Sequence, residues 1–307
     1  MVQDPAATLL FRPQPDCIQL MLERGLTKLT GKPTGAAAWS SLVTTKDVVG
    51  LKVFSSPGAL CGTRPAVVGA VVEGLLQAGV PAQNIVIWDR QTADLKQAGF
   101  MELGERYGVR IEGCDTVGYD KTVYYESPLL GSVIWGDLEF GRLTNSVGRN
   151  SYVSKLLSQR VTKIINISPL LNNNLAGVSG NLYGLAIGSV DNTMRFESER
   201  DRLATAVPEI YALPAVGDRV VLNIVDALIC QYEGGQRGLL HYSTTLNQLR
   251  LGFDPVALDV LSIQELERQR QVAQAPELRS PMELYQNASL LELGVSDPKR
   301  ILVEQAP

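Results

Sequence analysis

The feature of this sequence that most restricts its fold is the alternation of buried strands and a helix within the first hundred residues. Apolar, β-branched segments at 47–54 (DVVGLKVF) and 84–89 (NIVIWD) have the length and composition of buried strands. Between them, apolar residues recur at helical spacing, with Pro65 in the first turn and Gly79 at the end. A strand, a helix and a second strand in this order typically form a right-handed crossover between parallel strands. The sequence therefore predicts an α/β protein.

The rest of the chain continues this pattern and adds antiparallel pieces. The pair Asp254-Pro255 predicts a helix start, because Asp caps free N–H groups and Pro fits the first helical position. We predict a mostly parallel sheet flanked by helices, with added antiparallel hairpins. The expected elements are strands at 163–167, 219–226 and 300–303, hairpins at 121–143 and 246–252, helices near 151–159, 254–271 and 281–292, and a loop-rich stretch at 170–188.

The chain length bounds the domain organisation. Its 307 residues suffice for a single α/β domain over 1–307 or for two intimately packed lobes, roughly 1–145 and 146–307. No apolar run approaches the roughly 20 residues that span a bilayer, so no membrane span is expected. The first residues, MVQDPAATLLFRPQPD, lack the pattern of an export signal, but a mature exported protein would look the same. The compartment and the oligomeric state stay open.

Charge and the metal-binding residue types exclude several classes of function. The chain has 28 basic and 32 acidic residues and no basic block, so we expect no nucleic-acid partner. No CxxC pair is present, so an iron–sulfur cluster and a cysteine-ligated zinc site are not expected. A single histidine, His241, rules out metal sites built on two or three histidines. We expect buried thiols, with two long-range disulfides as the alternative, at Cys17, Cys61, Cys114 and Cys230.

A series of motifs in a fixed order resembles one known family. The matching stretches are VVGLKVFSS, TRPAVVGAVVEGLLQAGV, IVIWDR, IINISPLL, LAGVSGNLYG, LNIVDAL, YEGG, FDPVALDVL and ELGVSDPKRILVE. Over nearly its whole length the chain resembles the bacterial and archaeal domain-of-unknown-function family 362. The resemblance implies an α/β fold and no agreed activity. Some members carry inserted ferredoxin-type clusters, and this sequence has none of their cysteine motifs.

The chain departs from the family pattern where charged residues are usual. Leu171-Asn172-Asn173 stands where members typically have Lys-Thr-His, the Lys before the motif that begins at Asn181 is missing, and Phe196 stands where a His is expected. These departures indicate either a subfamily with another ligand or a member that binds without turnover.

The candidate site follows from where the predicted strands end. Ligands of open parallel sheets bind beyond the carboxyl ends of the strands. The helix that starts at Thr63-Arg64 directs free N–H groups and the positive end of its dipole to the same place, and Arg64 can hold a carboxylate or phosphate with two hydrogen bonds. We therefore predict a small anionic ligand at Lys52, Ser55, Ser56, Thr63, Arg64, Asp89, Arg90, Asn172, Asn173, Asn181 and Asp226.

These residues also have structural interpretations. Lys52 lies inside an apolar strand, where an unpaired charge is costly, so it either pairs with a carboxylate or reaches the ligand. Asp89 and Asp226 can cap turns, and Arg64 can hold loop carbonyls. No cofactor is predicted, although a metal held by Asp89, Asp226 and water stays open because such sites leave little trace in a sequence.

Two functions remain as hypotheses. The first is an enzyme or sensor that binds or transforms a small anionic metabolite at the strand ends. The second is a non-catalytic binding or scaffold protein, favoured by the missing Lys and His residues.

Overall fold

The protein is built around one mixed sheet. The computed structural model describes residues 1–127, 149–197, 199–275 and 280–306. The strand order in the sheet is β1 (Val2–Gln3), β12 (Ser243–Gly252), β11 (Val220–Gln231), β9 (Lys163–Asn173), β4 (Val49–Val53), β5 (Ile85–Asp89) and β6 (Arg110–Gly113), and β10 (Gly177–Val178) pairs with β9.

The centre of this sheet is parallel and its additions are antiparallel. Strands β11, β9, β4, β5 and β6 pair in parallel, whereas β12, β1 and β10 are antiparallel to their neighbours. Two small antiparallel sheets lie apart from it, β2 (Thr8–Leu9) with β3 (Arg12–Pro13) and β7 (Tyr119–Glu126) with β8 (Asn150–Ser154). The predicted fold class is therefore confirmed.

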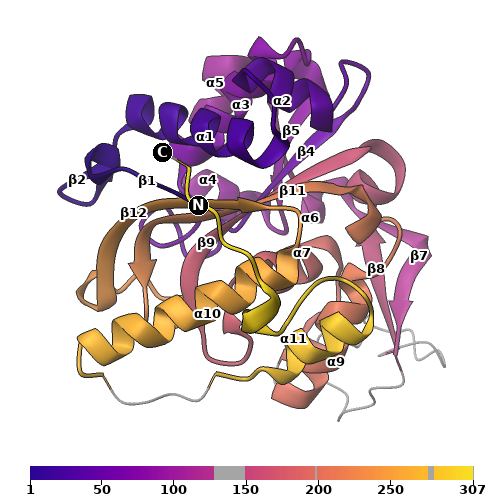
Figure 1. The fold of residues 1–307 in the computed structure, drawn as a ribbon. Coiled ribbons are helices and arrows are strands. Elements are labelled where there is room, and N and C mark those ends of the chain that lie inside the picture. The colour runs from indigo at the N-terminus through magenta and orange to yellow at the C-terminus, as the bar shows by residue number, and fades with distance from the viewer. Residues whose placement is uncertain (128–148, 198, 276–279, 307) are drawn as a thin grey trace.

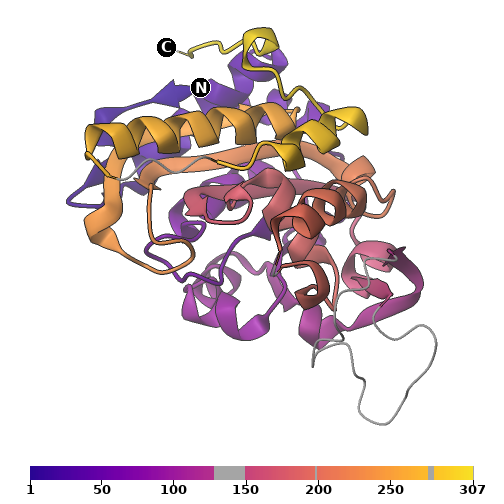
Figure 2. The same cartoon turned by 90° about the horizontal axis from the view of Figure 1, so that it is seen from below.

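Helices cover both faces of the sheet (Figure 1). The N-terminal helices lie on one face, and the C-terminal helices lie on the other, where α10 runs along β11 and β12 (Figure 2). The first group is α1 (Pro15–Thr30), α2 (Gly35–Leu42), α3 (Pro65–Gln77) and α5 (Met101–Tyr107); the second is α7 (Asn181–Ser189), α9 (Arg200–Tyr211), α10 (Pro255–Val272) and α11 (Glu283–Leu290). Shorter helices are α4 (Thr92–Gln97), α6 (Cys114–Val117) and α8 (Met194–Glu197), and single 3-10 turns occur at Pro5–Ala7, Ala82–Asn84, Gly217–Arg219, Leu240–Tyr242 and Pro298–Arg300.

This layering explains why the central strands are mainly apolar. All residues of β4 are buried because helices cover both sides of the strand. Leu51 and Val53 face the cluster under the N-terminal helices, so Lys52, which alternates with them, faces the C-terminal helices. The predicted helix starts are also confirmed: Pro65 occupies the first turn of α3, and the Asp254 carboxylate accepts from Ala257 N at 2.8 Å to cap α10.

Three local expectations were wrong. The segment expected as a helix near 151–159 begins instead as β8, whose alternating burial suits its pairing with β7, and only then forms a short π-helical turn, Leu156–Arg160. No strand forms at 300–303, because Arg300 ends a 3-10 turn, Pro298–Arg300, and residues 301–303 pair with no strand. The stretch 170–188 is not mainly loop, since β9 continues to Asn173 and α7 begins at Asn181.

Only the first part of the predicted hairpin region, 121–143, lies within the described ranges. Strand β7 pairs with β8, and residues 128–148 lie outside the described ranges. The sheet crosses the expected lobe boundary near 145, because β4 from the first half pairs with β9 from the second. Within the described ranges, none of the helices is long and apolar enough to span a membrane.

Candidate functional site

The carboxyl ends of β4 and β5 hold a buried ion pair. Lys52 Nζ lies 2.8 Å from Asp89 Oδ1, and the two side chains are almost completely buried. The other carboxylate oxygen of Asp89 accepts from Ser55 N at 2.7 Å and from Ser55 Oγ at 2.6 Å, and Oδ1 also accepts from Arg90 N at 2.8 Å. Helix α7 approaches this pair so closely that a Cβ on Gly188 would lie 2.2 Å from Lys52 Cε. Lys52 and Asp89 therefore form one closed network with Ser55.

A second buried ion pair joins α3 to β11. Arg64 Nη1 lies 2.9 Å from Asp226 Oδ1, and Arg64 N donates to Asp226 Oδ2 at 3.0 Å. The guanidinium also donates to the carbonyls of Leu60 and Ile229. Thr63 Oγ1 donates to Ile167 O at 2.7 Å and accepts from Phe54 N. The positive end of α3 is thus occupied by a carboxylate of the chain itself.

The predicted asparagines lie along β9 and at the start of α7. Asn172 accepts from Gly235 N at 2.6 Å, and Asn173 accepts from the backbone of the following turn. Asn181 donates from its backbone and its side chain to Asp259, which is completely buried, and accepts from Ser168. Burial raises the pKa of Asp259 to about 7, although these hydrogen bonds oppose the rise. These groups are engaged in holding loops and the N-terminus of α7.

Four polar groups lie near one another beside Asp89, and we call them the polar rim: Arg90 and Glu197 are half-exposed, Gln236 is exposed, and Tyr183 is buried. Arg90 Nη1 lies 3.8 Å from Glu197 Oε1, and these side chains are 29% and 26% exposed. Gln236 donates to the Tyr183 hydroxyl at 3.2 Å, and the Tyr183 ring packs on Phe54. Burial raises the pKa of Glu197, and burial, followed by the charge of Glu197, raises that of Tyr183 to about 12.

Apart from the three asparagines, the structure separates the predicted residues into two groups. Ser55, Lys52, Asp89, Thr63, Arg64 and Asp226 converge at the carboxyl ends of the strands but are buried, whereas Arg90 and Ser56 reach the surface. Sequence reasoning missed Glu197 and Gln236. Gln236 directly follows the YEGG motif, which could have drawn attention to it, but Glu197 had no signal beyond its place beside Phe196.

The positions that depart from the family pattern are packed into the core. Leu171 is completely buried, and so is Phe196, whose ring lies edge-on to Tyr125 with centroids 6.3 Å apart. Apolar side chains thus fill two of these places, and the buried amides of Asn172 and Asn173 fill two more.

The thiols and the histidine give no sign of nucleophilic chemistry. The four cysteines are free, and three of them are buried as expected, whereas Cys17 is half-buried. Burial raises the pKa of Cys61, and that of Cys114 to about 12. A raised pKa disfavours the reactive thiolate. His241 packs against Tyr242, with ring centroids 4.1 Å apart. In the part of the chain that the structure describes, His, Cys, Asp and Glu do not gather in groups of three or more suited to a metal ion.

Comparison with known proteins gives a family and a distant likeness to a solved structure. A family model described as a domain of unknown function (DUF362) matches residues 49–264. No curated protein matches the chain. A crystal structure of a protein from Thermotoga maritima is similar at 12% identity over 86% of this chain, with a TM-score of 0.45. The chain spans 60% of that protein's length.

Proposed function

The chain belongs to domain-of-unknown-function family 362, and we propose that it binds a small anionic metabolite, bearing a phosphate or a carboxylate, at the polar rim. The cation that holds the anion in this proposal is Arg90. Tyr183 and Gln236 supply neutral hydrogen-bond donors beside it. Glu197 is the rim carboxylate placed to accept a proton if the bound molecule is also transformed.

The supporting observation is that Arg90 has the loosest ion pair at this edge. Lys52 and Arg64 are buried and lie 2.8 and 2.9 Å from their carboxylates, whereas Arg90 and Glu197 are half-exposed and 3.8 Å apart. An exposed pair of this kind contributes only about 0–1 kcal/mol. A phosphate or carboxylate can take two parallel hydrogen bonds from a guanidinium, so it can replace Glu197 at little cost.

The buried pairs then have a positioning role. Asp89 accepts from Arg90 N and is itself held by Lys52 and by Ser55, so the backbone that carries Arg90 is fixed. Arg64 is a weaker candidate for direct binding, because Asp226 already occupies its guanidinium and the N-terminus of α3.

The test is thermal unfolding against a panel of phosphorylated and carboxylated metabolites. A ligand at about 100 times its dissociation constant stabilises the fold by roughly 2.7 kcal/mol. We expect Arg90→Ala to abolish the stabilisation. We expect Glu197→Gln to strengthen it, because the variant removes the carboxylate that competes for Arg90. The matched control is Arg268→Ala, which removes an exposed arginine that pairs with Glu265.

Two outcomes would count against the proposal. If no compound in the panel stabilises the protein, the proposal of an anionic ligand is wrong. A stabilising compound that acts equally on the wild type and on Arg90→Ala would move the site away from the rim.

The alternative is a non-catalytic binding or scaffold protein. The observation that favours it is that Leu171 and Phe196 fill the core where the family pattern has charged residues. A metal held by Asp89, Asp226 and water is a weaker proposal, because each carboxylate already faces a cation of the chain.

A further inference from the structure

The N-terminal hairpin carries an exposed apolar tip, and we call residues 8–13 the finger. Strands β2 and β3 pair Leu9 with Arg12, so Leu10 and Phe11 form a two-residue turn. The exposed fractions of Leu9, Leu10 and Phe11 are 64%, 87% and 43%. The finger thus offers three large apolar side chains to the surroundings.

The backbone of the finger tip is also unfavourable for these residues. Leu10 has φ 49° and Phe11 has φ 62°, both in the left-handed region. Two-residue hairpin turns with positive φ at both positions favour Asn-Gly, because bulky side chains are strained there. Leu10 buries little of its surface in the isolated fold, so an intermolecular contact gives a physical reason for a large apolar residue at this position.

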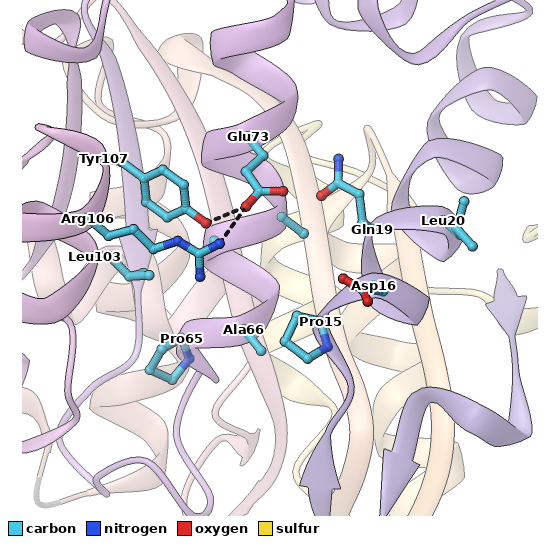
Figure 3. A pocket seen from close by; sticks show the side chains of 12 residues that line it. Pro15, Asp16, Gln19, Leu20, Pro65, Ala66, Glu73, Leu103, Arg106 and Tyr107 are labelled. Atoms are coloured by element: carbon cyan, nitrogen blue, oxygen red, sulfur yellow. Dashed lines mark hydrogen bonds and ion pairs between the residues drawn. The ribbon is translucent and has the colours of Figure 1, made fainter.

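A groove lies next to the finger on the same side of the molecule. It runs between α1, α3 and α5 and has a volume of about 470 Å³. Its floor has only short side chains, because α3 presents Ala66, Gly69 and Ala70 there. Figure 3 shows Ala66 next to Pro65 at the start of this helix. Apolar walls come from Pro15, Leu20, Pro65 and Leu103. Glu73 in the groove is neutralised by Arg106 and accepts from the Tyr107 hydroxyl.

The finger and the groove carry opposite charges without partners. Arg12, on the finger, and Asp16, on the groove wall, are exposed, and neither makes an ion pair with any described residue. The finger does not fill its own groove, since Leu10 is almost fully exposed. Strand β3 ends at Pro13 and α1 begins at Pro15, so the two surfaces are adjacent.

We propose that the finger of one copy of this chain inserts into the α1–α3–α5 groove of a second copy, with Arg12 facing Asp16. Because finger and groove are neighbours on one face, a two-fold axis between two such faces lets both contacts form at once. The partner is therefore a second copy of the chain, and the contact is independent of the polar rim.

Sedimentation velocity over a wide range of protein concentration tests this dimer. We expect the wild type to dimerise reversibly, and Arg12→Glu and Asp16→Arg each to raise the dimer dissociation constant about tenfold or more, because like charges then meet. The double variant Arg12→Glu/Asp16→Arg restores an attractive pair, so it should dimerise like the wild type.

A second variant separates association from folding. Leu10→Asn with Phe11→Gly places the favoured residues in the turn and removes the apolar tip, so it should be monomeric with an unchanged or higher unfolding temperature. A wild type that stays monomeric at all concentrations, including one that binds phospholipid vesicles instead, overturns the proposal. So does a dimer that neither the charge reversals nor the turn variant weakens.

Discussion

The charged residues of the carboxyl edge form closed pairs whose partners lie far apart in the chain. Arg64 meets Asp226 across the sheet, and Lys52 meets Asp89 on the neighbouring strand. Buried pairs of this kind do not necessarily stabilise a protein, but removal of one partner is costly because it leaves the other charge buried alone. Asp259 differs from both, since it is buried and receives N–H donors instead of a cation.

Asp259 makes the stability of the protein depend on pH. Its pKa is about 7 in the folded protein and ordinarily 3.8, so the unfolded chain releases this proton at lower pH than the folded chain does. The contribution of Asp259 to the free energy of unfolding is therefore fully present below about pH 4 and is lost as the pH rises through about 7. This contribution is a few kcal/mol at most. Urea unfolding of the wild type and of Asp259→Asn at pH 5 and pH 8 measures this contribution.

The wild type should lose more stability between these two pH values than Asp259→Asn does. The variant itself should be less stable than the wild type at both pH values. In the wild type Leu182 N donates to Asp259, and in the variant the amide NH₂ group would face this donor. Equal pH dependence in the two proteins would assign the effect to other groups.

At the scale of elements, helix α7 lies close to the sheet because it has small residues on the side that faces it. Gly188 contacts the Lys52–Asp89 pair, where a Cβ would lie closer to Lys52 than packed atoms can approach. The LAGVSGNLYG motif therefore has a packing role that is independent of ligand binding. Gly69 in helix α3 differs from Gly188, because a Cβ at this position would make only ordinary van der Waals contacts.

This contrast predicts opposite effects for two glycine-to-alanine changes. In Gly188→Ala the new Cβ would lie 2.2 Å from Lys52 Cε, so we expect a loss of about 1–3 kcal/mol from overpacking. In Gly69→Ala the nearest atom is 3.6 Å away, so the gain should be about 0.5–1 kcal/mol from helix propensity. Chemical denaturation of both variants measures these differences, and a destabilised Gly69→Ala or a neutral Gly188→Ala would contradict the packing described here.

At the scale of the whole molecule, the parallel strands are covered on both faces and the two small hairpins are not. Strand β9 is buried over nearly its entire length, whereas β7 is largely half-exposed or exposed. Both chain ends lie together beside β12, with Met1 accepting from Ala306 N. The centre of the sheet should therefore be the last part of the protein to open.

Hydrogen exchange followed by mass spectrometry can check this order. Amides of β4, β9 and β11 should exchange only through global unfolding, whereas those of β2, β3 and β7 should exchange through local opening at much lower free energy. Rapid exchange in β9, or protection of β7 equal to that of β9, would contradict this distribution of stability.

The sequence by itself determined the elements whose signals are local: the strands at β4 and β5, the helix starts at Pro65 and at Asp254-Pro255, the α/β class and the family. Hydrophobic period and capping chemistry act within a few residues, so they can be read without knowledge of the fold. The tertiary structure decided which carboxylate meets which cation, that Arg90 and not Arg64 has the loose pair, and that Glu197 and Gln236 join the rim. These contacts depend on strand order and helix placement, which bring together groups as distant as Arg64 and Asp226, and no local pattern encodes them.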